Sequence, residues 1–232
     1  MKKKALVLVH VNHLKEEKDK FSNLITLYDK CVEVTEEFSE GLFKDIEHVC
    51  ARSGSIGYKD IKKHLSDYSK IAIAGVWGGE CHLSSYTKVL RYYLEHKEHI
   101  DIELPLDGTF FYVKKDSVMF YNRAKFAGDH WMELPEDLKG WESHYISLDT
   151  LLGKEKGDDL NNRIGKYIPE YIHAFNFNYG NVLVRVHHND EFIFRAYLAE
   201  QDLNLIRWFK RKRGINTDSY LKVNLNLVKR LG

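Results

Sequence analysis

Three side chains that can support nucleophilic chemistry follow short apolar segments of the sequence: Cys81, His10 and Arg52. Cys81 comes after the apolar run 71–74 and a glycine-containing turn, where a helix is expected to begin. The start of a helix lowers the pKa of a thiol, because exposed N–H groups and the helix dipole favour the thiolate. A thiolate with a histidine in reach can accept an acyl group. We therefore predict Cys81 as nucleophile, His10 as the base that takes its proton, and Arg52 as an anion-binding cation.

Each of these residues also has a purely structural interpretation. Cys81 can be a small buried residue that packs the start of a helix, since free cysteine is among the most buried residue types. His10 can be hydrogen-bonded to backbone at a strand end, and Arg52 can form a surface ion pair. Around the three residues, backbone N–H groups of the turn can bind a carboxylate or phosphate. The predicted substrate-binding residues are Asn12, Trp77, Gly78 and Gly79.

The first half of the chain alternates between strand and helix patterns. The runs 5–9 and 71–74 are continuously apolar, which is typical of strands buried on both faces of a parallel sheet. Apolar spacing predicts further elements: helices at 21–32, 58–68 and 83–93, and strands at 46–52 and 100–104. Such alternation favours a parallel sheet with helices on its faces. Ligands of these sheets bind at the carboxyl ends of the strands, where the three candidate residues fall.

The pattern changes after residue 108. Hairpins are predicted from 110–113 with 118–121 and from 182–186 with 192–198, and helices at 158–175 and 199–213, while 122–141 shows no clear period. The predicted fold class is α/β: a Rossmann-like parallel sheet with flanking helices over 1–108, followed by an α+β C-terminal half with β-hairpins over 109–232. The alternative is that the two halves share one sheet.

Composition excludes several classes of protein. The chain has 232 residues, 35 Lys+Arg against 34 Asp+Glu, and 44% hydrophobic residues, which argues against disorder and against a nucleic-acid coat protein. The apolar run after Met1–Lys4 is too short for a signal peptide or a membrane span. Three cysteines, an odd number, suggest free thiols in a reducing compartment. A cytoplasmic protein with no membrane partner is expected.

Neither a cofactor nor a metal site is predicted. The glycine-containing segments match no nucleotide-binding motif. Twelve histidines in a chain of this length produce loose groups of metal-ligating residue types by chance. Three such groups occur: His10 with His13, Glu80 and His82; Asp129 with His130 and Glu133; and His187 with His188, Asp190 and Glu191.

The C-terminal end is basic. Its cations are interleaved with Trp208 and Phe209, a combination that suits phosphate contacts and base stacking; they are Arg207, Lys210, Arg211, Lys212 and Arg213. A solvated helix face with its rings in the core explains the same pattern.

The first half resembles the isochorismatase-like hydrolases, the superfamily that includes nicotinamidases. The first strand of that family ends in Asp, an apolar residue, and Gln or Asn, and residues 5–12 fit this frame with His10 in place of the Asp. A later strand of the family ends in Gly, with the nucleophilic Cys six residues on at a helix start, and Gly75 and Cys81 have this spacing. Asp107-Gly108 is similar to the family's Asp-Ala pair after the next strand.

The resemblance covers about residues 4–110 and implies a cysteine-dependent hydrolase of a small amide or ester. The sequence departs from the family in three ways. His10 replaces the catalytic Asp, and the catalytic Lys has no clear counterpart, Arg52 being the nearest cation. The Asp-x-His metal motif is also absent. In addition, 34–49 is too short and acidic for a normal strand–helix unit.

These observations lead to three hypotheses about function. The chain is a divergent hydrolase of a small-molecule substrate, an inactive relative that binds a protein partner, or a nucleic-acid-binding protein acting through its basic end. The many Lys, Asn and Tyr residues are compatible with an AT-rich bacterial or phage genome, and phage proteins often bind host factors.

Overall fold

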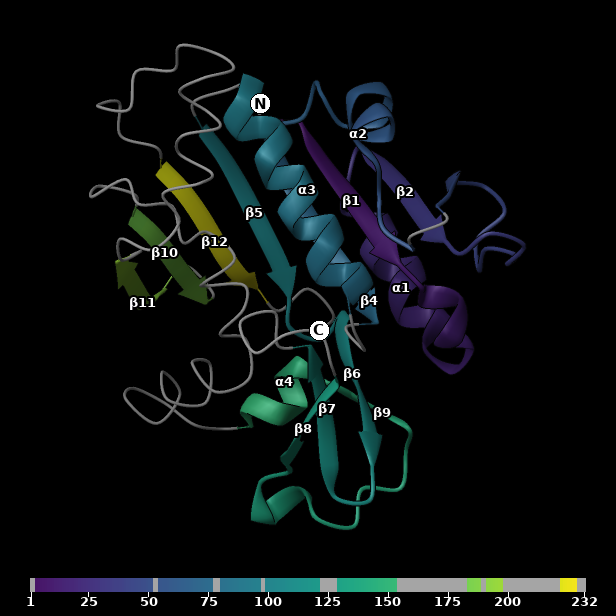
Figure 1. Ribbon diagram of the computed structural model, residues 1–232, viewed down its shortest axis with the longest axis vertical. Helices are drawn as coiled ribbons and strands as arrows, with labels where there is room; N and C mark the ends of the chain where they lie inside the picture. The colour runs from purple at the N-terminus through teal and green to yellow at the C-terminus, as the bar shows by residue number, and fades with distance from the viewer. Residues whose placement is uncertain are drawn as a thin grey trace.

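The protein has a mixed α/β architecture with a mostly parallel central sheet (Figure 1). The computed structural model describes residues 3–51, 54–76, 80–96, 99–121, 129–153, 183–188, 191–197 and 222–228. Within these ranges, no helix has the length and apolar character needed to cross a membrane.

The elements fall in two groups along the chain. The first group alternates strands and helices: β1 (Lys4–Val9), α1 (Lys18–Ile25), β2 (Lys30–Thr35), β3 (Glu47–Cys50), α2 (Tyr58–His64), β4 (Lys70–Val76), α3 (Glu80–His96) and β5 (His99–Pro105). The second group is richer in strands: β6 (Thr109–Lys114), β7 (Ser117–Tyr121), β8 (Asp129–Glu133), β9 (Tyr145–Ser147), α4 (Leu148–Leu152), β10 (Leu183–His188), β11 (Glu191–Tyr197) and β12 (Lys222–Val228). Short 3₁₀ turns lie at Val11–His13, Lys15–Glu17 and Glu136–Leu138.

The strands of the central sheet follow the order β3-β2-β1-β4-β5-β12-β10-β11. The pairings from β3 to β10 are parallel, and β11 is antiparallel to β10. Both halves of the chain contribute to this path, since β12 lies in parallel register with β5. The predicted domain boundary after residue 108 stays a prediction.

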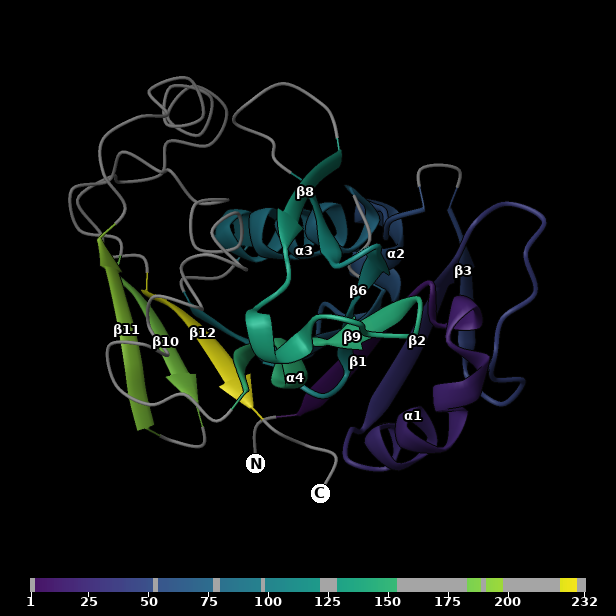
Figure 2. The same cartoon turned by 90° about the horizontal axis from the view of Figure 1, so that it is seen from below.

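Helices cover both faces of the sheet. Seen along the strands, α2 and α3 lie on one side of β1 and β2, and α1 lies on the other (Figure 2). On the α1 side, Phe21 and Leu24 pack against Leu6, Leu8 and Ala72 in one buried cluster. Every residue from Ala5 to Val9 is buried, as expected for a strand with both faces covered.

The helix expected over 21–32 is wrong in its second half. Helix α1 ends at Ile25, and residues 30–35 form β2 beside β1. Glu33, an acidic residue in the middle of β2, is fully buried. Its carboxylate accepts hydrogen bonds from the backbone N–H groups of Leu42 (2.6 Å) and Phe43 (3.1 Å). The loop after β2 therefore supplies the partners that make a buried carboxylate tolerable.

The structure differs from the expectations for the second half at several points. Strand β8 lies within 122–141, where no period was visible, and β12 was not predicted. The two expected hairpins correspond to β6 with β7 and to β10 with β11. The helices expected at 158–175 and 199–213 lie outside the described residues.

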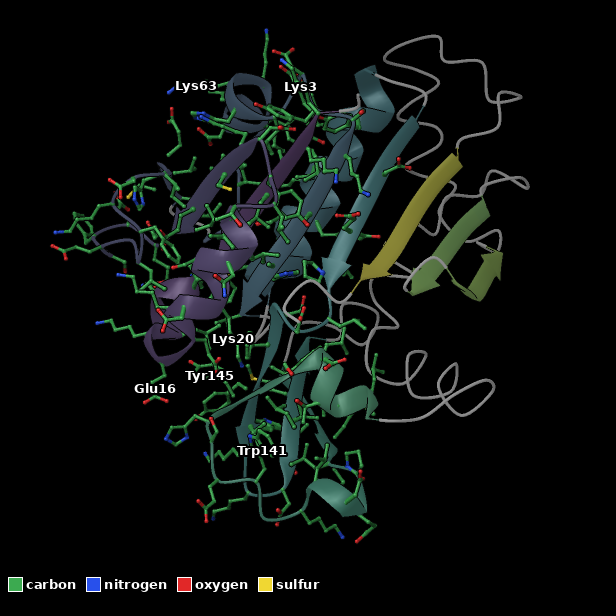
Figure 3. The ribbon with its side chains drawn as sticks, turned by 180° about the vertical axis from the view of Figure 1, so that it is seen from behind. Lys3, Glu16, Lys20, Lys63, Trp141 and Tyr145 are labelled. Atoms are coloured by element: carbon green, nitrogen blue, oxygen red, sulfur yellow. The ribbon has the colours of Figure 1, made fainter. Side chains whose placement is uncertain are left out.

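Strands β6 to β9 form an antiparallel extension beyond the carboxyl end of β4. Strand β6 continues the edge of β4 at Gly75 and Val76, then pairs with β7 and β9 (Figure 1). Aromatic rings cluster on this extension: Tyr112 contacts Trp131, His144 and Tyr145, at ring-centroid distances of 5.9, 6.4 and 5.8 Å. Nearby, the indole N–H of Trp141 donates to the carbonyl of Tyr145 (Figure 3).

The central contact of the sheet is the close approach of β1 and β4 at Val9 and Gly75. Gly75 has φ of +121°, and a β-carbon there would overlap the Val9 carbonyl oxygen and lie 2.8 Å from the Val9 nitrogen. Its own N–H donates to the Gly108 carbonyl at 2.8 Å. Glycine is required here both by the conformation and by the space available.

We expect Gly75→Ala to lower the free energy of unfolding by about 3 kcal/mol or more, because strain and a clash with backbone act together. Gly140→Ala is the matched control: Gly140 has φ of +78°, but nothing lies within 4 Å of its built β-carbon. That variant should lose only the conformational part, about 1–2 kcal/mol. Urea unfolding of both variants measures the difference, and equal losses would contradict the close approach of the two strands.

Candidate active site

Three segments meet at the carboxyl end of the parallel sheet. His10 directly follows β1, Gly54 lies in the loop between β3 and α2, and Cys81 is the second residue of α3. Residue 10 is held at the strand end because its N–H donates to the Val34 carbonyl of β2 at 3.0 Å. The parallel pairing of β1 with β4 brings the start of α3 to the same edge of the sheet.

The side chains of His10 and Cys81 converge on the α-carbon of Gly54. A β-carbon built on Gly54 would lie 2.6 Å from Cys81 Sγ and 2.7 Å from His10 Nε2. The two atoms are therefore no farther apart than the sum of these distances. Gly54 has φ of +61°, which a glycine adopts without strain. Because glycine has no side chain, the position that its β-carbon would occupy is free of Gly54 atoms and lies next to both the thiol and the imidazole.

The His10 ring is oriented by two oxygens. Nε2 lies 2.8 Å from the Gly54 carbonyl, and because a carbonyl only accepts hydrogen bonds, Nε2 carries a proton in this arrangement. Nδ1 lies 3.8 Å from the Glu36 carboxylate, whose side chain is 58% exposed. His10 itself has φ of +55°, a conformation that costs free energy in a residue other than glycine and is often retained at functional sites.

This geometry changes the role predicted for His10. With Nε2 donating to Gly54, the ring does not accept the Cys81 proton at that nitrogen. It presents an N–H beside the sulfur instead, and a carboxylate lies beside Nδ1. A ring protonated at both nitrogens would satisfy both oxygens and place a positive charge next to the thiol, which favours the thiolate.

The residue after Cys81 in α3 is the histidine His82. This side chain is fully buried, and burial lowers its pKa from the ordinary 6.5 to about 3, against the opposing effect of a hydrogen bond with the Ile73 backbone. The nearby His10 ring lowers this pKa further. His82 is thus neutral at physiological pH and adds no charge beside His10.

Asn12 brings an unsatisfied acceptor to the end of β1. Its Oδ1 atom is buried and has no hydrogen-bond partner among the described residues. Buried acceptors are nearly always paired, so each exception needs an explanation. A donor on a bound substrate would supply one.

The cysteines differ in their surroundings. None of the three forms a disulfide. Cys31 is buried in the core cluster, and burial raises the pKa of its thiol to about 11, the opposite of what a nucleophile needs. Cys50 is exposed on the edge strand β3, and Cys81 is half-buried beside the His10 ring.

The structure brings together two of the three predicted catalytic residues, His10 and Cys81. Several predicted site residues lie outside the described residues: Arg52, Trp77, Gly78, Gly79, and the basic group Arg207, Lys210, Arg211, Lys212 and Arg213. Sequence analysis missed Glu36 and Gly54. Glu36 was hidden because β2 was taken for helix, so its place after a strand end was not recognised. Gly54 lies in one of the glycine-containing segments that match no nucleotide-binding motif, and its sequence pattern gives no other sign of a role.

No group of three metal-ligating side chains lies close enough to hold an ion within the described ranges. Comparison of the chain with protein-family models, curated proteins and solved structures finds no match.

The burial of His82 predicts a loss of stability in acid. The unfolded chain takes up a proton at this residue below about pH 6.5, while the folded chain stays unprotonated down to about pH 3. Lowering the pH by one unit within this window should therefore lower the free energy of unfolding by about 1.4 kcal/mol. His82→Gln should remove this contribution, so its urea-unfolding curves should depend less on pH between 6.5 and 3. Parallel pH dependence in the two proteins would contradict the burial of a neutral histidine.

Proposed function

We propose that the chain is a divergent isochorismatase-like hydrolase that uses Cys81 to cleave a small amide or ester. The observation that carries the proposal is the convergence of Cys81 Sγ and the His10 ring on Gly54 at the carboxyl end of a parallel sheet. Cysteine-dependent acyl transfer uses a thiol with an imidazole beside it. Here the pair lies at the strand ends where ligands of α/β proteins typically bind.

The proposed fold is a Rossmann-like sheet whose strand order around β1 supports the resemblance. Strands β3, β2, β1, β4 and β5 are neighbours in that order and run in parallel. The nucleophile follows β4 at the start of α3, a helix of 17 residues whose N-terminal dipole favours a thiolate.

The reaction consists of two acyl transfers. In the reactive pair the thiol proton already resides on the His10 ring, which is then protonated at Nε2 and at the Nδ1 that faces Glu36, and the thiolate attacks the carbonyl carbon of the substrate. The S–C bond forms, the C–N or C–O bond breaks, and the leaving amine or alcohol takes the proton from the ring. Water then attacks the thioester, which releases the carboxylic acid and restores the thiol. Asn12 Oδ1 would accept a hydrogen bond from the bound substrate.

The first test is the pH dependence of Cys81 alkylation by iodoacetamide. Cys31→Ala and Cys50→Ser remove the other thiols, alanine being chosen for the buried position. We expect Cys81 to react as a thiolate well below the reference pKa of about 8.5, and this profile to move to higher pH in His10→Ala. An ordinary profile that His10→Ala leaves unchanged would overturn the proposal and favour an inactive, partner-binding protein.

Turnover provides the second test. Cys81→Ala should abolish hydrolysis of p-nitrophenyl acetate and of a panel of primary amides, with little change in unfolding free energy because a half-buried thiol is replaced by a methyl group. Cys50→Ser, at an exposed cysteine on β3, is the matched control and should retain activity. Equal turnover in the wild type and Cys81→Ala would contradict the mechanism.

Gly54→Ala tests the convergence itself. The added methyl group occupies the point between Cys81 Sγ and His10 Nε2, and both are ends of side chains that can move away. We expect a modest stability loss of about 1–2 kcal/mol from the positive φ. Activity should fall by about 100-fold, because displacement of reacting groups by about 1 Å has that effect. Retained activity in the folded variant would show that the two side chains need not meet at Gly54.

A further inference from the structure

A hydrogen-bonded seam joins α3 to the segment 54–56. Cys81, Ser85 and Lys88 stand at i, i+4 and i+7, so they share one face of the helix. Lys88 Nζ donates to Ser55 Oγ at 2.6 Å, and the backbone N–H of Ile56 donates to Ser85 Oγ at 3.2 Å. Both serines are buried, with 1% and 0% of their surface exposed.

The Ser55–Lys88 pair has the residue types of a Ser–Lys catalytic dyad, but its burial gives it a different role. No substrate can reach the Ser55 hydroxyl at 1% exposure. A protonated lysine has three donors and no acceptor, so in this contact the ammonium holds the serine oxygen in place. A hydrogen bond with a charged donor is shorter and stronger than one between neutral groups.

We propose that Lys88 is a positioning residue of the Cys81–His10 site, acting through Ser55 on the Gly54 peptide. This inference rests on the proposed function. Ser55 is bonded directly to Gly54, whose carbonyl orients the His10 ring and whose α-carbon faces Cys81 Sγ. The Gly54 N–H donates to the Ala51 carbonyl at 2.7 Å, which fixes the peptide on its other side. Fixing Ser55 to α3 thus sets the distance of the Gly54 carbonyl from both reactive side chains.

The test compares Lys88→Met, which keeps the stem but loses the donor, with Lys88→Arg, which keeps a cationic donor. Hydrolysis of p-nitrophenyl acetate should fall by about 10- to 100-fold in Lys88→Met and recover in part in Lys88→Arg. Ser55→Ala should match Lys88→Met, and the double variant should be no worse than either, since both remove one interaction. Lys139→Met is the matched control: Lys139 also donates at 2.6 Å, to Glu136, but on the surface of the antiparallel extension.

A second measurement does not depend on turnover. The ¹⁵N spectrum of the His10 ring, assigned by comparison with His10→Ala, reports which nitrogen carries the proton. In the wild type and Lys139→Met it should show a protonated Nε2, and in Lys88→Met a mixture of tautomers. If Lys88→Met does not fold, Ser55→Ala and Lys88→Arg carry the same comparison.

The outcomes separate the two proposals. A changed His10 spectrum in Lys88→Met supports the positioning role even if the wild type hydrolyses no ester or amide, which would count against the proposed function alone. An unchanged spectrum with unchanged turnover in a folded Lys88→Met protein overturns the positioning role and leaves the proposed function standing. A loss of stability with an unchanged spectrum also overturns it, because the contact would then be merely structural.

Discussion

The arrangement of the site depends on the contact between Val9 and Gly75. β1 and β4 approach so closely there that only a residue without a side chain fits, and the N–H of that residue donates to the Gly108 carbonyl. The contact fixes where β1 and β4 end relative to one another. His10 at the end of β1 and the start of α3 beyond β4 are then placed at one edge of the sheet. A constraint in the apolar core thereby helps determine the position of the polar residues that follow the two strands.

A second glycine, Gly54, brings the two side chains into one site. His10 and Cys81 belong to separate segments, and Gly54 of a third segment lies against both. Its carbonyl orients the imidazole, and its missing side chain leaves space beside the sulfur. The backbone conformation of His10, with φ of +55°, ends β1 and leads into the 3₁₀ turn at Val11–His13. Such a conformation persists only where surrounding interactions hold it. Here the bond from the His10 N–H to Val34 and the bond from its ring to Gly54 do so.

Much of this arrangement can be predicted from the sequence, and the exceptions have physical causes. Continuous apolar runs identified β1 and β4, and the turn after β4 identified the start of α3, because strands buried on both faces leave an unambiguous pattern. Strand β2 was hidden because Cys31 and Val32 continue the helical apolar spacing that begins at Phe21, and the partners that let Glu33 lie buried come from a loop about ten residues later. Without β2, Glu36 could not be placed beside His10. Gly54 carries no side chain and leaves no chemical signal, so its role depends on tertiary contacts alone.

Polar residues in the sheet can be distinguished by how fully they are satisfied. Glu33 is buried with two backbone donors, and Glu103 is buried between the Tyr28 hydroxyl and the Lys70 ammonium. Such complete pairing offsets the cost of burying a charge and makes these carboxylates part of the scaffold. At the carboxyl end of β1 the pairing of the described residues is incomplete: Asn12 Oδ1 is buried without a partner, and His10 Nδ1 faces the exposed Glu36 carboxylate at 3.8 Å. Such incompletely paired groups contribute little to stability, because a buried polar atom without a partner costs free energy. Among the described residues, the paired carboxylates inside the sheet thus belong to the scaffold, whereas Asn12 Oδ1 and His10 Nδ1 lie at the end of β1, where the substrate site is proposed.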